Sequence, residues 1–507
     1  MRAELLALTM LAAPAAAQQA PASAIPWLSD SLSAPATVAP AAPAAPRPDE
    51  PAATPLTPSD VTVMPLGQTR RDAVGLLSSR LTGLPADTWA ASDPARVAAL
   101  IAQQPAEAVP AMQDLVRMLL LAELDPPRGA TDPDALFFAR VDGLLRFGAL
   151  DHAQALLERA GATDAEAFRR WWDTSLLTGF DTRACDAMTA NPGVAPTLPA
   201  RIFCLTRTGD WAAAALTLDT GRALGAISDS DDILLARFLE PEMFEGEPPP
   251  VPPRPMTPLA FRLLDGIGET PSISGLPLAF AVADLRPTTG WKSRIEAAER
   301  LTRAGALDAN RLLALYTEGR PSASGGVWDR AAAIQALDAA LIAGDAEAVA
   351  ATLPPAMEQM EQAGLLVPFA DLYGEKLAQV DPGPEVSAVA LRAGLLSPAY
   401  ERVAEGAAPS DPLDAFAVAV ALGDANASPP PGDLPRAVAD GLTGEPPEHL
   451  TRLADAGRLG EALLEAAVLL ADGAKADPQD IADALAFFRS VGLVEIARRT
   501  ALQLLLA

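Results

Sequence analysis

The chain has 507 residues, enough for two or three hydrophobic cores, so a single small module is excluded. Its formal net charge of −27 repels phosphate backbones and anionic lipid, which argues against a nucleic-acid or membrane-surface partner. Hydrophobic residues make up 50% of the chain and aromatic residues only 5%, and Ala and Leu dominate. Because Ala and Leu are among the best helix formers and no period-two strand pattern is sustained, the sequence predicts an all-α protein.

The first 17 residues, MRAELLALTMLAAPAAA, have the pattern of a secretory signal peptide. Arg2 supplies a short positive region, an apolar stretch follows, and Ala15-Ala16-Ala17 fits the small-residue rule for cleavage before Gln18. No later stretch reaches the ~20 consecutive apolar residues that a membrane helix needs. We therefore expect a cleaved, exported protein of a bacterial periplasm, without a membrane span.

Residues 18–66 are rich in Pro and Ala and lack helical periodicity, which predicts a disordered, partly extended arm. The segment IPWLSDSL within it carries apolar side chains of a kind that is rare in such arms. One interpretation is a docking peptide that folds onto a partner or back onto its own chain, and the other is incidental hydrophobicity. The residues of the docking hypothesis are Ile25, Trp27, Leu28 and Leu32.

Two helical regions follow the arm, at 67–240 and 259–507, with a connector at 241–258 between them. The connector is crowded with prolines from 248 to 255, which block a helix and favour a stiff extended chain. A domain boundary is therefore expected at the connector.

In both regions, apolar residues at helical spacing are interrupted by Gly, as in FFARVDGLLRFGALDHAQALLERAG, where the break falls at Gly148. This pattern predicts antiparallel helical hairpins joined by turns centred on Gly. The same punctuation recurs at Gly209, Gly305, Gly344, Gly394, Gly457 and Gly492.

The pattern resembles degenerate tetratricopeptide-type repeats, in which G-x-x-x-x-A joins the paired helices of a solenoid. Gly457 and Gly492 lie about 35 residues apart and Gly305 and Gly344 about 39 apart, close to the length of such a repeat. The other intervals are irregular and the Trp, Leu-Gly and Tyr positions of the full signature are missing. The resemblance thus implies an irregular α-solenoid, and proteins of that kind are mostly scaffolds that present a concave surface.

The two cysteines, Cys185 and Cys204, are expected at similar distances from a turn between two antiparallel helices. Neighbouring helices then bring the two Cα atoms within disulfide range. In an oxidising compartment this predicts a structural disulfide worth about 3 kcal/mol.

No cofactor, metal site or catalytic residue is predicted. His152 and His449, the two histidines, each follow a turn and are expected to be solvated residues at helix starts. No H-E-x-x-H or C-x-x-C motif and no EF-hand spacing occurs. Trp171 and Trp172 point to different helix faces, so one is expected in the core and the other partly exposed or in a groove wall.

The most varied side chains occur in LYTEGRPSASGGVWDRAAAIQ, residues 315–335. Pro321 and the Gly-Gly pair predict a loop between two helices, and no His or Lys is at hand to activate Ser322 or Ser324. Two interpretations remain, a structural loop and a binding loop whose guanidinium groups and aromatic rings capture a partner. The residues of the binding hypothesis are Tyr316, Arg320, Ser324, Gly325, Gly326, Trp328, Asp329 and Arg330.

The sequence as a whole favours a non-catalytic periplasmic scaffold or adaptor that mediates protein–protein interaction in a cell-envelope assembly. The alternative is a regulator or helical shell associated with peptidoglycan metabolism, by analogy with other exported helical proteins. A third interpretation is direct binding of carbohydrate or peptide on the concave face.

Overall fold

The computed structural model describes residues 70–128 and 132–507, and these residues form an all-α protein, as predicted. Within these ranges β-pairing is limited to one isolated bridge between Leu77 and Ala122. No helix there is both long and apolar enough to cross a membrane. The predicted signal peptide, the arm at 18–66 and the docking residues within it lie outside the described residues.

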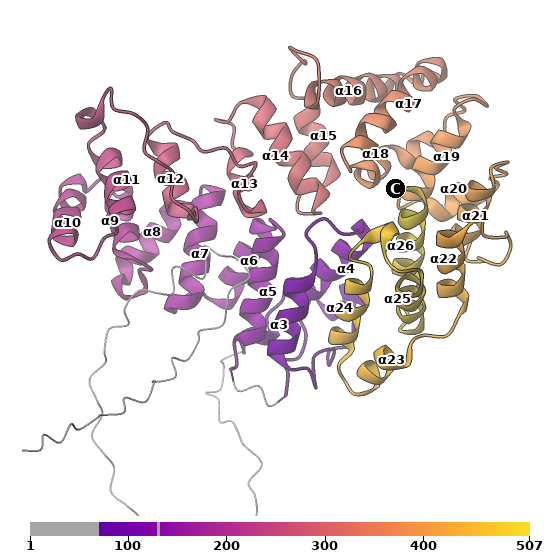
Figure 1. Cartoon of the computed structure of the whole chain (residues 1–507), viewed down its shortest axis with the longest axis horizontal. Coiled ribbons are helices and arrows are strands. Elements are labelled where there is room, and N and C mark those ends of the chain that lie inside the picture. The colour runs from indigo at the N-terminus through magenta and orange to yellow at the C-terminus, as the bar shows by residue number, and fades with distance from the viewer. Residues whose placement is uncertain (1–69, 129–131) are drawn as a thin grey trace, which may run out of the picture.

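The first half of the chain runs outward as a row of helices, and the later helices of this row pack mainly on their neighbours in the sequence. In Figure 1 this row extends from α3, near the centre, to α10 at the left. Its helices are α2 (Ser79–Thr82), α3 (Pro94–Gln103), α4 (Pro110–Leu121), α5 (Ala135–Arg146), α6 (Leu150–Ala160), α7 (Ala165–Thr178), α8 (Asp181–Ala190), α9 (Leu198–Arg207), α10 (Trp211–Ala223) and α11 (Asp229–Leu239).

The second half first returns along the outward row and then passes beyond it (Figure 1). α12 packs on α11 and α7, and α13 also packs on α7. The helices of this half are α12 (Pro258–Gly266), α13 (Ala281–Asp284), α14 (Trp291–Arg303), α15 (Ala309–Thr317), α16 (Val327–Ala343), α17 (Ala346–Gln362), α18 (Leu366–Leu377), α19 (Ser387–Leu396), α20 (Tyr400–Ala404), α21 (Pro412–Ala421), α22 (Asp433–Thr443), α23 (Glu448–Asp455), α24 (Leu459–Leu469), α25 (Pro478–Ser490) and α26 (Val494–Leu506).

The last helices close the structure into a ring by packing on the first ones. α24 packs on α3 and α26 packs on α4, so the yellow and indigo segments of Figure 1 lie side by side. The Ala111 N–H donates to Oε1 of Gln503, 392 positions later, at 2.8 Å. Likewise, the Gln104 side chain donates to the Leu464 carbonyl at 2.9 Å. We call this contact between α3–α4 and α24–α26 the seam.

Trp89, in the turn before α3, fills the seam. Its side chain is 2% exposed and lies against Gly460, where any Cβ would overlap the indole ring. Two backbone hydrogen bonds fix the approach, from Gly460 N–H to the Thr88 carbonyl and from Ala91 N–H to the Gly457 carbonyl, both at 3.0 Å. The absence of a side chain at Gly460 therefore lets the two ends of the ring meet at backbone distance.

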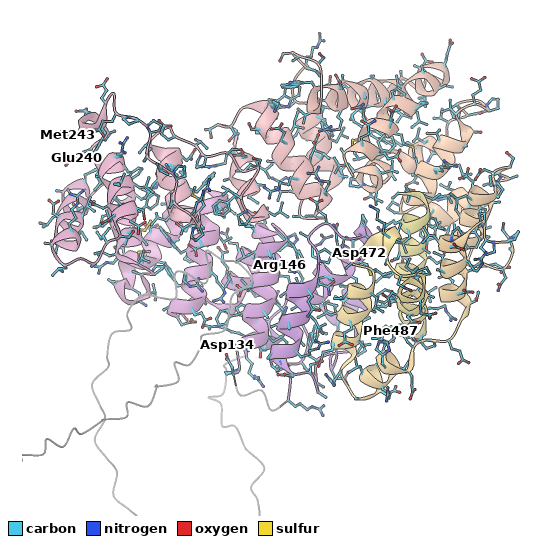
Figure 2. The ribbon with its side chains drawn as sticks, in the orientation of Figure 1. Asp134, Arg146, Glu240, Met243, Asp472 and Phe487 are labelled. Carbon is cyan, nitrogen blue, oxygen red and sulfur yellow. A yellow bond between two sulfur atoms is a disulfide. The ribbon has the colours of Figure 1, made fainter. Side chains whose placement is uncertain are left out.

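Among the described residues, the opposite end of the molecule has no such partner. At α9–α11 and the turn after them, several large apolar side chains are exposed, and Figure 2 shows Met243 at this outer end. We call this region the free edge, and its exposed apolar residues are Trp211, Leu216, Leu224, Ile233 and Met243.

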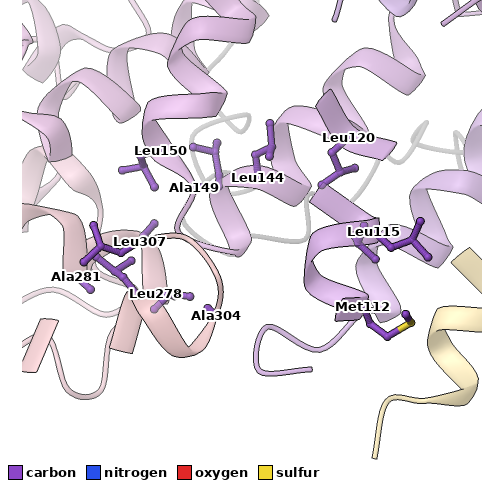
Figure 3. Close-up of a cluster of buried hydrophobic side chains, with 14 of the residues drawn as sticks. Met112, Leu115, Leu120, Leu144, Ala149, Leu150, Leu278, Ala281, Ala304 and Leu307 are labelled. Carbon is purple, nitrogen blue, oxygen red and sulfur yellow. The ribbon is translucent and has the colours of Figure 1, made fainter. Parts of the chain in front are cut away.

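The Pro-rich connector does not divide the described residues into two separate cores. After the short η4 turn (Pro241–Phe244), residues 245–256 run without a helix, and α12 then packs back on α11 and α7. Buried apolar residues before and after the connector belong to one cluster. In Figure 3, Leu278, Ala281 and Leu307 of the returning half lie near Ala149 and Leu150 of the outward row.

The predicted Gly turns are observed at six of the seven positions, where Gly has a positive φ between two helices. The prediction for Gly394 is wrong, because this residue lies inside α19. A Cβ there would come within 2.6 Å of a Val403 methyl group, so Gly394 allows close helix packing rather than a turn. The six observed turns are at Gly148, Gly209, Gly305, Gly344, Gly457 and Gly492.

Candidate functional site

The loop at 315–335 is held by its own side chains. The Tyr316 side chain is fully buried, and its hydroxyl donates to Oε1 of Glu299 at 2.8 Å. The Arg330 guanidinium donates to both oxygens of Glu299, at 2.8 and 2.6 Å. Trp328 packs on Trp291, with ring centroids 5.0 Å apart.

The prediction that Tyr316 offers an exposed flat surface is therefore wrong, because its side chain is buried and its hydroxyl is committed to Glu299. Arg330 is likewise committed, since removing it would strand a buried carboxylate. Asp329 accepts from the Gly325 N–H at 3.0 Å, which orders the loop. Of the residues in the binding-loop hypothesis, Arg320, Ser324 and Gly326 are exposed and take no part in the side-chain contacts that hold the loop.

The remaining sequence-predicted residues have clear positions. Cys185 of α8 and Cys204 of α9 form a disulfide with Cα atoms 5.0 Å apart, as predicted. Trp171 and Trp172 are both buried, so one of them lies in the core as predicted, but the other is not partly exposed. His449 is exposed in the first turn of α23, whereas His152 is half-buried in the first turn of α6.

His152 lies on a groove inside the ring that no local motif indicates. The groove has two connected parts, with volumes of about 500 and 310 Å³. We call the larger part the polar chamber and the smaller part the apolar chamber, and together they form the ring groove. Both chambers are lined by the start of α6 and by the α14–α15 turn, through Asp151, His152, Leu307 and Arg311.

The polar chamber is built from segments far apart in the sequence. α4 anchors the α14–α15 turn, since Gln113 donates to the Arg303 carbonyl at 2.7 Å and Arg117 donates to the Gly305 carbonyl. The Arg303 guanidinium donates in turn to the Ala363 carbonyl at 3.2 Å, which ties the α17–α18 turn to the same wall. α26 completes the wall next to the seam. Besides Asp151 and Arg311, the charged side chains that line the chamber are Asp114, Arg117, Arg303, Asp308, Asp371 and Arg499.

Most of these charges are paired. Asp114 accepts from Arg117 at 2.5 Å and lies 3.5 Å from the guanidinium of Arg499. Asp308 is the N-cap of α15 and accepts from the Arg311 backbone N–H at 3.0 Å. Asp371 differs from them, because no direct ion pair joins it to another described residue of the chamber.

The enclosure of the chamber changes the proton affinity of two groups. Asp371 is reached by water yet surrounded by protein, and the resulting desolvation raises its pKa to about 6, against the attraction of Arg499. The repulsion from Asp114 adds to the rise. Burial lowers the pKa of His152, and Arg117 lowers it further. Both effects favour the neutral form of His152.

The apolar chamber lies on the other side of Arg311, between the end of α7 and the α13 region. Phe180, which directly follows α7, is 56% exposed and forms part of its rim. In Figure 3, Leu150 and Leu307 approach this part of the groove from the outward row and from the α14–α15 turn. The main apolar lining consists of Leu150, Phe180, Val282, Leu285, Pro287 and Leu301.

Arg311 stands at the boundary of the two chambers. Its guanidinium lies 3.6 Å from Asp151, and the side chains of both residues are more than half exposed. An ion pair of this length and exposure contributes little to stability. Arg311 can therefore turn to the carboxylate of a ligand without leaving a buried charge behind.

The groove has the features of a binding site. Within the described ranges, no group of three or more His, Cys, Asp or Glu side chains is placed to hold a metal ion. The groove instead offers an apolar surface, a replaceable guanidinium and a lined chamber within the size range of ligand pockets.

Comparison with known proteins gives no relative. No family model, no curated protein and no solved structure matches this chain. The groove itself is therefore the main guide to function.

Proposed function

We propose that this protein is a non-catalytic helical adaptor of the cell envelope and that the ring groove binds an extended segment of a protein partner. One observation carries the proposal. The apolar and polar chambers share a boundary at Asp151 and Arg311, so that one ligand can occupy both.

An extended peptide is the ligand class that fits this arrangement best. It presents apolar side chains and charged groups along one line, and the groove offers partners for both. Apolar side chains fill the chamber beside Phe180, where desolvation supplies most of the affinity. A carboxylate of the peptide replaces Asp151 on Arg311, which fixes direction and register.

Two features support the periplasmic location that we propose. A disulfide between Cys185 and Cys204 supports an oxidising compartment, and the signal-like first 17 residues support export into the periplasm. The charge of −27 supports a protein partner in preference to nucleic acid. The alternative role in peptidoglycan metabolism uses the same groove with a muropeptide as the occupant.

The test is site-specific photocrosslinking in cells. A photoreactive phenylalanine analogue replaces Phe180 on the groove or, as a matched control, Leu216 on the free edge, since both positions are exposed and apolar. We expect a discrete protein adduct from position 180, none from 216, and loss of the adduct when Arg311→Glu is added.

Equal adducts from both positions, or an adduct that Arg311→Glu leaves unchanged, would contradict the proposal. Displacement of the adduct by soluble muropeptides, but not by peptides, would assign the groove to the alternative function.

A further inference from the structure

We propose that residues 25–32 of the chain's own N-terminal arm, IPWLSDSL, occupy the ring groove and that the protein partner must displace them. This inference rests on the proposed function, because it takes the groove to be a peptide-binding site. It adds an intramolecular ligand and a means of regulation. Three features support this occupant: the point where the arm joins the helices, the length of the intervening chain, and the chemistry of the segment.

The arm joins the helical structure next to α6 and α7. Arg71 forms an ion pair with Asp134, the N-cap of α5, at 3.0 Å, and another with Asp164, the N-cap of α7. It also donates to the carbonyl of Gly161, the C-cap of α6, at 3.1 Å. One arginine thus gathers one end of each of three neighbouring helices.

The ring groove lies at the other ends of the same three helices. Gly148, between α5 and α6, and Phe180, directly after α7, both line the apolar chamber. α7 has 14 residues, which at 1.5 Å per residue is about 21 Å. The arm therefore begins about one helix length from the groove.

The chain between the segment and this point is long enough to cover that distance. Roughly 37 residues separate Leu32 from Arg70, and even a chain of this length with random-coil statistics, more compact than an extended Pro-rich one, has a root-mean-square span of about 33 Å. Tethering over such a span gives an effective concentration on the order of 1 mM. Even an intrinsic affinity in the micromolar range would then keep the groove mostly occupied.

The segment and the groove also match in chemistry. Ile25, Trp27 and Leu28 supply a compact apolar group for the chamber beside Phe180, whose exposed ring offers an aromatic face. Asp30 follows two residues after Leu28 and supplies one carboxylate for Arg311 at the chamber boundary. The segment thus carries an apolar group followed by a carboxylate, as we infer for a partner peptide.

An occupied groove lowers the apparent affinity for any other peptide by the fraction of molecules in which the groove is open. The arm then acts as a built-in competitor. A partner that presents a tighter segment, or that captures the arm, opens the groove.

The test uses the full chain and a fluorescent synthetic peptide of residues 20–34 as the probe. In one variant Trp27→Ala and Leu28→Ala remove the apolar group from the arm, which leaves the described helices untouched. We expect this variant to bind the probe at least about 10-fold more tightly than the native chain, because its groove is open. A matched variant with Val38→Ala and Leu56→Ala, in the same arm but outside the segment, should bind like the native chain.

Groove variants decide where the probe binds. Adding Phe180→Asp to the open-groove variant should abolish binding, whereas adding Leu216→Asp on the free edge should not. A photoreactive residue at position 27 of the full chain should crosslink to the lining of the apolar chamber within the same molecule.

The proposal is overturned by equal probe affinity in the native and open-groove chains, or by no binding to either. It is also overturned if Leu216→Asp rather than Phe180→Asp abolishes binding, or if position 27 crosslinks two chains together. If these results appear while the partner adduct at position 180 persists in cells, only this inference fails. If that adduct is also absent, the proposed function fails with it.

Discussion

The seam and the free edge are built from the same Ala- and Leu-rich helices, yet they end the helical array in opposite ways. At the seam, backbone groups of Thr88 and Ala91 bond directly to residues near Gly460, and Trp89 is sealed between them. At the free edge, Trp211 stays half exposed, and a disulfide ties α9, the first helix of this edge, to α8 instead.

The two ends differ in how they protect the apolar face of the terminal helices. A helical hairpin cannot bury its apolar face alone, so the end of an array needs either a partner or a reinforcement. The seam supplies the partner from the other end of the same chain. The free edge keeps exposed apolar side chains and is reinforced by a covalent bond that constrains the unfolded state.

The largest expected effect comes from the same substitution made at both ends. Trp89→Ala should lower the free energy of unfolding by about 4 kcal/mol, because it empties a fully packed site at the seam. Trp211→Ala, at a side chain that is 50% exposed, should cost about 1 kcal/mol. Chemical denaturation monitored by circular dichroism measures both. Similar losses at the two sites would show that the seam is not a tight closure.

Removal of the disulfide tests whether the bond reinforces the free edge. Replacing Cys185 and Cys204 with Ala should cost about 3 kcal/mol, given their separation of 19 residues. The loss should be local, so amide hydrogen exchange should accelerate in α8–α10 and stay unchanged in α24 and α26. Faster exchange at the seam would mean that the two ends are coupled through the ring.

Gly460→Ala should cost about 2 kcal/mol, since its Cβ overlaps the Trp89 ring and the backbone there is fixed by hydrogen bonds. The control is Gly193→Ala in the α8–α9 turn, where the nearest atom to a Cβ is 3.5 Å away. Thermal unfolding compares the two variants. A neutral Gly460→Ala would indicate that the seam opens readily.

The smallest effect is a dependence on pH at the inner side of the seam. The pKa of Asp371 is raised from 3.8 to about 6, so the unfolded chain releases this proton at lower pH than the folded one. Stability should therefore fall as the pH rises from about 4 to about 6 and then level off. Asp371→Asn should remove this decline, which at a solvent-accessible site is worth about 1 °C in melting midpoint. A difference between variant and native protein that is constant with pH would contradict this assignment.

Much of the fold could be predicted from local sequence. Helical spacing of apolar residues, Gly at the turns and the symmetric positions of Cys185 and Cys204 about one turn each report on structure within about 40 residues. The turn predicted at Gly394 was wrong because a glycine needed for close packing looks the same in sequence as one needed for a turn.

The ring and its groove could not be predicted in this way. Closure depends on small rotations between successive helices that accumulate over the array, and no local pattern records their sum. The groove residues Asp114, Arg311, Asp371 and Arg499 each look like ordinary surface charges on separate helices. The prediction for the loop at 315–335 was partly wrong because Tyr316 and Arg330 lie close in sequence to exposed residues, yet both side chains turn inward. They share one carboxylate, Glu299, as their partner.

Closure also restricts how a protein of this kind can evolve. An open array can gain or lose hairpins at its ends, because each repeat contacts only its neighbours. A ring has a fixed circumference, so a hairpin added within the closed path, which passes from α7 directly to α12 and α13, would carry Gly460 past Trp89 and open the seam. Changes of length should therefore be tolerated in the outward segment α8–α11 and selected against everywhere along the closed path.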